Sequence, residues 1–345
     1  MTSAFADLLP ETQTWCVTGA AGFIGSHLVE ALLNHGQRVV GLDNFATGHR
    51  ANLDDVRQRV APEAWTRFDF REGDIRRLSD CRDALSSTDI LLHQAALGSV
   101  PRSIQNPLAT HEANVDGFVN ILVSARDAGV SRVVYASSSS VYGDHPGLPK
   151  VEGEIGTPLS PYAVSKRINE LYAATFADHY GLRAIGLRYF NVFGPRQDPQ
   201  GAYAAVIPRW IGGLLSGGQP VIHGDGETSR DFCYIDNVVQ ANLRAATASH
   251  ARGVYNVAVG ERTTLNELYA QILAGLRAAS GEDGWPPAQH GPFRSGDVRH
   301  SLANTDRARA ELDYAPSHSA AEGLRETVRW FLSRASVQTR QAPQT

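Results

Sequence analysis

The feature that most constrains the fold of this chain is a glycine-rich turn near its N-terminus. The apolar run Trp15-Cys16-Val17 leads into Gly19, Gly22 and Gly25, which have the spacing GxxGxxG. In such a turn the first glycine permits the bend from strand to helix, the second lets the backbone approach a pyrophosphate, and the third lets helix and strand pack closely. The N-terminus of the next helix offers free N–H groups to phosphates. The segment predicts the strand–turn–helix unit of a dinucleotide-binding fold.

An acidic residue follows this turn at the expected distance. The strand-like run Arg38–Leu42 ends before Asp43, which lies eighteen residues beyond Gly25. A carboxylate at this place can accept hydrogen bonds from both ribose hydroxyls and repels a 2′-phosphate, which favours NAD over NADP. Asp74 and Ile75 follow a third strand-like run, where they could flank an adenine.

Short apolar runs alternate with longer amphipathic ones over the first half of the chain. Alternation of this kind predicts βαβ units and a parallel sheet. We therefore expect an α/β fold with a Rossmann-type doubly wound parallel sheet. The predicted strands are Thr14–Val17, Arg38–Leu42, Asp89–His93 and Arg132–Ala136, and the predicted helices are Gly25–Gly36 and Asn106–Ala128.

The composition and pattern of the sequence change at about residue 190. Proline, glycine and loop signals become frequent, and one clear helical stretch remains at Thr264–Ala279. We expect a dinucleotide-binding domain over 13–190 and a smaller, irregular α/β substrate domain over 191–335, with elements interleaved with the first. Residues 1–12 read as an N-terminal extension, and the polar residues 336–345 as a flexible tail.

Composition excludes several classes of function. The formal net charge is -4 and no Lys/Arg-rich run is present, which argues against a nucleic-acid partner. The chain has no apolar stretch of the length that spans a membrane, and its N-terminus lacks the pattern of a signal peptide, which indicates a cytoplasmic protein. Cys16, Cys81 and Cys233 lie far apart without metal-ligand spacing, so we expect reduced, buried thiols and no metal site.

A second motif indicates the chemistry. Tyr162 and Lys166 form YxxxK at the start of a helical run, and their spacing places both on one helix face. A tyrosine is a poor base at neutral pH, but a neighbouring ammonium favours its phenolate. The run of four serines at 137–140 follows a predicted strand. A hydroxyl at the carboxyl end of a strand could relay a proton between a reacting oxygen and the tyrosine.

These segments together resemble a known family. Over about residues 13–335 the chain is similar to extended short-chain dehydrogenase/reductases. The motifs that carry this likeness are TGAAGFIGSH, DNFATG, AALGSVPRS, SSSSVYGD, SPYAVSK, RYFNVFGPRQ and GDGETSRDF. The closest likeness is to bacterial NAD-dependent UDP-N-acetylglucosamine 4-epimerases of polysaccharide biosynthesis. The resemblance implies a catalytic triad of Ser138, Tyr162 and Lys166, with Ser139 as the alternative hydroxyl.

The resemblance also implies two sets of binding residues. The implied NAD contacts are Gly19, Gly22, Phe23, Ile24, Gly25, Asp43, Asn44, Gly48, Asp74, Ile75, Gln94, Ala95, Ala96, Asn114, Tyr162, Lys166 and Tyr189. The implied nucleotide-sugar contacts are Gly98, Ser99, Ser138, Ser139, Tyr162, Asn191, Val206, Val221, Arg230, Arg294, Asp297 and Ser301. Two arginines suit a diphosphate, because a guanidinium binds phosphate oxygens in a bidentate manner.

Differences within the family narrow the expected reaction. Its 4,6-dehydratases carry Thr-Asp-Glu where this chain has Ser138-Ser139-Ser140, so the acids for water elimination are missing. Its glucuronate decarboxylases place a glutamate in the same loop, which this chain lacks. Its galactose-type epimerases carry a bulky tyrosine where this chain has Ser301, and a small residue leaves room for an N-acetyl group.

The expected function is therefore C4 epimerisation of a UDP-sugar, interconverting UDP-GlcNAc and UDP-GalNAc through a transient 4-keto sugar with NAD retained. The alternative is a 4-epimerase of UDP-N-acetylhexosaminuronate or UDP-glucuronate, since Arg102 or His300 could serve a C6 carboxylate. More remote alternatives are a plain dehydrogenase and a non-catalytic NAD-sensing regulator. The resemblance also implies a homodimer formed through a four-helix bundle, with the helices around Asn106–Ala128 and Tyr162–Tyr180 from each subunit.

Overall fold

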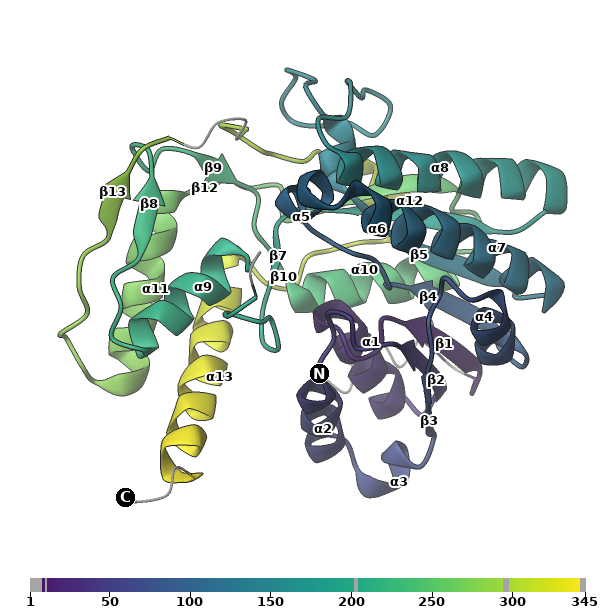
Figure 1. Ribbon diagram of the computed structural model, residues 1–345, viewed down its shortest axis with the longest axis horizontal. Helices are drawn as coiled ribbons and strands as arrows, with labels where there is room; N and C mark the ends of the chain where they lie inside the picture. The colour runs from purple at the N-terminus through teal and green to yellow at the C-terminus, as the bar shows by residue number, and fades with distance from the viewer. Residues whose placement is uncertain (1–7, 10, 202–203, 294–297, 342–345) are drawn as a thin grey trace. The chain divides into compact units, whose positions relative to one another are not determined.

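The structure is a computed structural model that describes residues 8–9, 11–201, 204–293 and 298–341, with side chains up to residue 335. The chain forms two compact units (Figure 1). The first comprises Met1–Tyr189, Val238–Val257 and Asn304–Ala315, and the second comprises Phe190–Asn237, Ala258–Ala303 and Pro316–Thr345. Two later segments of the chain thus return to the first unit.

The first unit contains a seven-stranded sheet in the order β11-β6-β5-β4-β1-β2-β3, in which every neighbouring pair is parallel. This order and direction confirm the predicted α/β, Rossmann-type sheet. Its strands are β1 Thr14–Thr18, β2 Arg38–Asp43, β3 Phe68–Glu72, β4 Ile90–His93, β5 Arg132–Ser138, β6 Ala184–Tyr189 and β11 Gly253–Val257.

Helices cover both faces of this sheet, because parallel strands need crossover connections. The helices α4, α7 and α8 pack on one face, and α1 and α10 cover the other (Figure 1). The helices of this unit are α1 Phe23–Asn34, α2 Arg50–Arg59, α3 Pro62–Trp65, α4 Leu78–Leu85, α5 Val100–Gln105, α6 Pro107–His111, α7 Gly117–Asp127, α8 Pro161–Tyr180, α10 Ile235–Thr247 from residue 238 onward, and α12 Asp306–Leu312.

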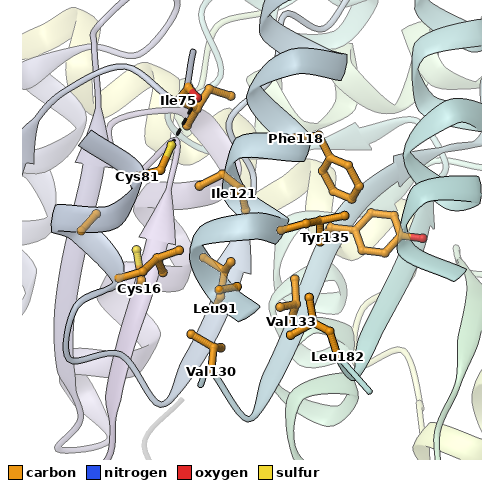
Figure 2. Close-up of a cluster of buried hydrophobic side chains, with 14 of the residues drawn as sticks. Cys16, Ile75, Cys81, Leu91, Phe118, Ile121, Val130, Val133, Tyr135 and Leu182 are labelled. Atoms are coloured by element: carbon orange, nitrogen blue, oxygen red, sulfur yellow. Dashed lines mark hydrogen bonds between the residues drawn. The ribbon is translucent and has the colours of Figure 1, made fainter. Parts of the chain in front are cut away.

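The core under α4, α7 and α8 is built from the alternate residues of the strands. Figure 2 shows Leu91 and Val133 of neighbouring strands facing Phe118 and Ile121 of α7. Burial on this scale removes apolar surface from water and is the main stabilising contribution. The three cysteines are free and buried, as predicted. Burial raises the pKa of the Cys81 thiol to about 12, so it stays protonated at neutral pH.

The helix predicted over Asn106–Ala128 is continuous but irregular. Between α6 and α7 it contains a π turn, Glu112–Asp116, which inserts one wide turn into the α-helical ladder. Such turns bulge the backbone and often occur at functional sites. Here the bulge carries Asn114, which is buried.

The second unit consists of short strands and three helices among its described residues. They are β7 Val192–Phe193, α9 Val206–Leu215, β8 Val221–His223, β9 Ser229–Arg230, β10 Cys233–Tyr234, β12 Thr263–Thr264, α11 Leu265–Ser280, β13 Gln289–Gly291 and α13 Ala320–Gln341. The helix α11 matches the predicted Thr264–Ala279, and Thr264 caps its N-terminus with a capping box. The backbone of α13 extends to Gln341, six residues into the range that the sequence assigned to a flexible tail.

None of the helices in the described ranges is both long and apolar enough to cross a membrane.

Candidate active site

Four strands place their last residues at one edge of the sheet. Thr18 of β1 pairs with His93 of β4, and Ser138 of β5 pairs with Tyr189 of β6. In an open parallel sheet the carboxyl ends of the strands lie at one edge, where ligands of this fold class bind. Many of the predicted dinucleotide residues lie at or just after strand ends of this sheet, and Tyr162 and Lys166 lie on α8.

The glycine turn after β1 brings backbone segments into direct contact. Gly19 has a φ of 70°, and its N–H donates to the Leu42 carbonyl at 2.8 Å. A Cβ at Gly25 would lie 2.0 Å from the Gly19 carbonyl oxygen, and a Cβ at Gly19 would lie 2.8 Å from the Ala95 nitrogen. Only glycine fits at these two positions. Gly22 is the N-cap of α1, so the helix begins at Phe23 and presents its first N–H groups beside this turn.

Asp43 stands at the end of β2 and is fixed by backbone donors. Its Oδ2 accepts from the Ala21 N–H at 2.9 Å, and its Oδ1 accepts from the Phe45 N–H at 2.8 Å. Burial raises the pKa of this carboxyl, and the same two backbone hydrogen bonds oppose the rise. The carboxylate is thus pre-oriented beside the glycine turn.

Asp74 is engaged by two side chains. Arg76 approaches its Oδ2 at 2.6 Å, and the Asn44 amide donates to the same oxygen at 3.0 Å. The hydrogen bond from Arg76 lowers the pKa of Asp74 to about 2 against the effect of burial. Ile75 is buried, and a Cβ at Gly117 would lie 2.7 Å from its Cδ1. Asp74 therefore remains ionised and is joined to Asn44, another predicted NAD contact.

Hydrogen bonds connect further predicted residues after β4. Tyr189 donates to Oε1 of Gln94 at 3.1 Å, and the Gln94 amide donates to Asn242 of α10 at 3.1 Å. The Ala95 N–H donates to the Thr18 hydroxyl at 3.2 Å. The segment 94–96 is thereby held against the glycine turn and β6.

Asn114 links the π turn to two other segments. Its Oδ1 accepts from the Leu97 N–H at 2.7 Å, and its Nδ2 donates to the Leu97 carbonyl and to the Ser165 hydroxyl, both at 3.1 Å. Ser165 lies on α8 beside Lys166. The side chain of Asn114 thus holds the π turn, the segment at Leu97 and α8 together by hydrogen bonds.

The four serines have different environments. The Ser137 hydroxyl is buried and donates to Glu170 of α8 at 2.7 Å, whereas Ser139 begins a 3₁₀ turn, Ser139–Tyr142. Ser138 caps that turn, and its hydroxyl donates to the Ser140 hydroxyl at 3.1 Å. Ser138 also lies near enough to Tyr162 to lower the pKa of the tyrosine, whereas Ser137 is engaged by Glu170.

Burial raises the pKa of Tyr162, and Ser138 opposes that rise. The ammonium of Lys166, the predicted source of such an effect, lies on the same helix. Nζ of Lys166 lies 5.9 Å from the Tyr162 ring centroid and donates to the Ala136 carbonyl at 2.8 Å. Burial lowers the pKa of Lys166 to about 8. The ammonium form still dominates at neutral pH.

Glu170 and Arg188 were not among the predicted site residues, and Ser137 was predicted only as one of the four serines. Glu170, Arg188 and Ser137 form a buried polar cluster behind the serine loop, with Arg188 bidentate to Glu170 at 2.8 and 2.9 Å. Two signals in the sequence could have indicated it. Glu170 follows Lys166 by one helical turn, and Arg188 is a charged residue within an otherwise buried strand.

Residues 15–258 match the family described as "NAD dependent epimerase/dehydratase family". The chain belongs to this family. A curated UDP-glucose 4-epimerase of Mycolicibacterium smegmatis is 37% identical over 321 residues, covering 92% of this chain and 98% of that protein. The family assignment confirms the short-chain dehydrogenase resemblance and NAD as the cofactor.

Two solved structures of epimerases are also similar. A UDP-N-acetylglucosamine 4-epimerase from Methanobrevibacter ruminantium, in complex with UDP-N-acetylmuramic acid, has a TM-score of 0.85 and 38% identity over 94% of this chain and 99% of its own. A UDP-glucuronic acid 4-epimerase from Bacillus cereus, in complex with UDP-glucuronic acid and NAD, has a TM-score of 0.80 and 29% identity over 93% and 99%.

The residues of this family member fit NAD in three respects. The close approach at Gly19 and Gly25 leaves a bare backbone surface where a pyrophosphate needs one, and α1 begins beside it. The Asp43 carboxylate is held by backbone donors at the end of β2, the place where a carboxylate can accept from ribose hydroxyls. A Cβ at Gly48 would lie 2.8 Å from the Ala21 carbonyl carbon, so the loop after β2 lies against the same turn.

The predicted nucleotide-sugar residues are divided between the units. Gly98 and Ser99 precede α5 in the first unit, and Ser99 has a φ of 139°, which non-glycine residues rarely adopt. In the second unit the Ser301 N–H donates to the Ser229 carbonyl at 3.0 Å, and Nη1 of Arg230 donates to the same carbonyl at 3.0 Å, so Ser301 and the side chain of Arg230 meet at one carbonyl of β9. The remaining predicted positions are Asn191 before β7, Val206 at the start of α9 and Val221 at the start of β8. Arg294 and Asp297 lie outside the described residues.

Replacing Lys166 by methionine should stabilise the cofactor-free enzyme at neutral pH. The pKa of Lys166 falls from 10.5 in the unfolded chain to about 8 in the fold, so keeping the buried ammonium at pH 7 costs about 3 kcal/mol. This cost disappears as the pH rises from 8 to 10.5, because the folded lysine is then neutral while the unfolded one still binds a proton. Urea unfolding of both proteins between pH 7 and 10 measures the difference, which should shrink steadily above pH 8. A difference in the free energy of unfolding that does not vary with pH would contradict the lowered pKa of Lys166.

Proposed function

We propose that the enzyme catalyses NAD-dependent C4 epimerisation of a UDP-sugar, with UDP-GlcNAc and UDP-GalNAc as the preferred pair. The observation that carries the proposal is the placement of Ser138 at the carboxyl end of β5, with Tyr162 and Lys166 one helical turn apart on α8 and Lys166 bound to the Ala136 carbonyl of the same strand. The relatives named above are all 4-epimerases of UDP-sugars. Ser301, a small residue, and the 38% identity to a UDP-N-acetylglucosamine 4-epimerase support the N-acetylated sugar.

The side chains of this chain supply the proton transfers. Tyr162, as phenolate, takes the proton from the sugar 4-hydroxyl, and the Ser138 hydroxyl bridges the two oxygens. NAD held at the glycine turn would supply a hydride acceptor and donor for C4 of the sugar, so the reaction would leave no net redox change. Lys166 keeps a positive charge near the phenolate at pH values below about 8. The buried ammonium lowers the stability of the free enzyme, and its benefit comes in the reaction, where it stabilises the phenolate.

The test is to incubate the purified enzyme with UDP-GlcNAc, UDP-glucose and UDP-glucuronate separately and to follow each C4 epimer by NMR. We expect the highest kcat/KM with UDP-GlcNAc, no accumulation of NADH at its absorbance band, and NAD released on denaturation. Higher kcat/KM with UDP-glucuronate would identify a uronate epimerase. Stoichiometric NADH would identify a dehydrogenase, and NAD binding without turnover would identify a regulator.

We also propose that the enzyme is a homodimer through the helices of its first unit. Pro107, Leu108, Leu159 and Val164 line an apolar groove at α6 and α8. Leu108 is 75% exposed and Leu159 is 59% exposed in the single chain. Large apolar side chains gathered on one surface mark interaction sites, and a second copy of the same helices would form a four-helix bundle there.

Replacing Leu108 by glutamate should convert the dimer to a monomer. The substitution places a charge in an apolar interface and should raise the dimer dissociation constant by at least about tenfold, which corresponds to roughly 1.4 kcal/mol. Light scattering after size exclusion measures the mass at micromolar concentration. Val298→Glu is the matched control, since Val298 is also an exposed apolar residue but belongs to the second unit. A Leu108→Glu protein that stays dimeric would show that the interface lies elsewhere.

A further inference from the structure

The carboxylate of Glu170 is buried within the first unit and accepts hydrogen bonds on both oxygens. Oε1 accepts from the Ser137 hydroxyl at 2.7 Å and from Nε of Arg188 at 2.8 Å. Oε2 accepts from Nη2 of Arg188 at 2.9 Å and from Nη1 of Arg167 at 3.0 Å. Burial alone would raise the pKa of Glu170, but these donors outweigh it and lower the pKa. The carboxylate is therefore ionised over the working pH range.

Arg188 extends the cluster to the far side of the serine loop. It is almost fully buried, donates from Nη1 to the Glu152 carbonyl at 2.9 Å, and lies 4.8 Å from the ring centroid of Tyr142. Tyr142 ends the 3₁₀ turn that begins at Ser139. The Glu170–Arg188 pair thus contacts both ends of the segment 137–142. A buried, bidentate pair of this kind has a fixed geometry, because a broken partner would leave an unpaired charge inside the protein.

This cluster joins the two elements that carry the reacting groups. Glu170 lies on α8, one turn beyond Lys166 and two turns beyond Tyr162, on the buried face of the helix. Its partner Ser137 is the residue directly before Ser138 at the end of β5. The hydrogen bond between Ser137 and Glu170 therefore fixes the end of β5 against the helix that carries the tyrosine.

We infer that Glu170 is a positioning residue, which acts through Ser137 to hold Ser138 in place beside Tyr162. The inference rests on the proposed function and deepens it, since it concerns the same proton transfer. Ser138 lowers the pKa of Tyr162 against the effect of burial, so a displaced serine changes both the geometry and the acidity of the tyrosine. Small displacements at a reacting centre reduce rates severely.

The test compares Ser137→Ala with Ser124→Ala in the NAD-containing enzyme. Ser137→Ala removes the hydrogen bond that joins Ser137, the neighbour of Ser138, to Glu170. It leaves the Glu170–Arg188 pair intact. Ser124 on α7 is the matched control, because its hydroxyl is equally buried and has no hydrogen-bond partner among the described residues. The measurements are kcat, KM, and the pH dependence of kcat/KM. For Ser137→Ala we expect kcat to fall roughly tenfold with KM little changed. We also expect the acidic limb of the pH profile to move to higher pH, while Ser124→Ala matches the wild type.

A purely structural role would give a different result. Wild-type kcat in Ser137→Ala would overturn the inference, and so would a lower kcat with the acidic limb in its original place. Glu170→Gln should move the acidic limb in the same direction as Ser137→Ala. Ser137→Ala decides the question even where Glu170→Gln fails to fold. Tyr162→Phe separates a failure of the proposed function from a failure of the positioning role. If that variant keeps its activity the proposed function fails, whereas an inactive Tyr162→Phe beside a fully active Ser137→Ala refutes only the positioning role.

Discussion

Replacing Tyr162 by phenylalanine is expected to lower kcat by about two to four orders of magnitude, the usual contribution of a positioned general base. The variant keeps the ring and loses only the hydroxyl, whose pKa Ser138 lowers. Its free energy of unfolding should change by only about 1 kcal/mol, the size of a single polar interaction. The content of bound NAD should stay at the wild-type level. Steady-state kinetics with UDP-GlcNAc, together with NAD quantified after denaturation, provide the measurement.

Tyr172→Phe is the matched control for this variant. Tyr172 lies on the same helix α8 but is 40% exposed, so loss of its hydroxyl should leave kcat unchanged. A Tyr162→Phe enzyme with near-wild-type kcat would refute the role of Tyr162 as the base. Equal losses in the two variants would instead indicate a general effect on the helix.

Replacing Gly25 by alanine should remove NAD binding and destabilise the fold. The new Cβ would lie 2.0 Å from the Gly19 carbonyl oxygen and 2.7 Å from the carbonyl carbon of the same residue. Backbone atoms cannot yield as a flexible side chain can, so α1 must move away from β1. We expect a loss of about 3 kcal/mol or more, at the upper end for overpacking. Loss of bound NAD would add to it, because a ligand bound to the native state stabilises that state.

Gly213→Ala provides the control for this prediction. Gly213 lies in α9, and a Cβ there would meet no heavy atom within 4 Å. Alanine in a helix is favoured over glycine by up to about 1 kcal/mol, so this variant should be as stable as the wild type or slightly more stable. Urea unfolding and NAD content measure both variants. If Gly25→Ala retains its NAD and its stability, the close contact in the turn is not required.

The sequence predicted the parts of the fold that depend on local pattern. The strand–turn–helix around Gly19 and Gly25, the acid at the end of β2 and the helix carrying Tyr162 all depend on residues close together in the chain. The π turn within Asn106–Ala128 was not predictable in this way. It is accompanied by hydrogen bonds of Asn114 to Leu97 and Ser165, and these contacts join segments up to 51 residues apart.

The residues alone did not distinguish the four serines, and the prediction of Ser138 came from the family resemblance. Four adjacent serines have the same side chain, and only the end of β5 and the start of the 3₁₀ turn give them different directions. Glu170, which accepts the hydrogen bond from Ser137, lies 33 residues further along the chain, and Arg188 lies 18 residues beyond Glu170. Contacts of this kind depend on how strands and helices pack, and no local pattern specifies them.

The return of later segments to the first unit has a consequence for synthesis on the ribosome. The edge strand β11 and the helix α12 come from 253–257 and 306–312, after all of 190–237 has been translated. Until then β6 is the outer strand of a six-stranded sheet, with its free edge open to pairing with another nascent chain. The NAD-binding unit cannot therefore be completed as an N-terminal module during translation. Its completion must wait for more than three hundred residues, and the edge of β6 is exposed to other chains until then.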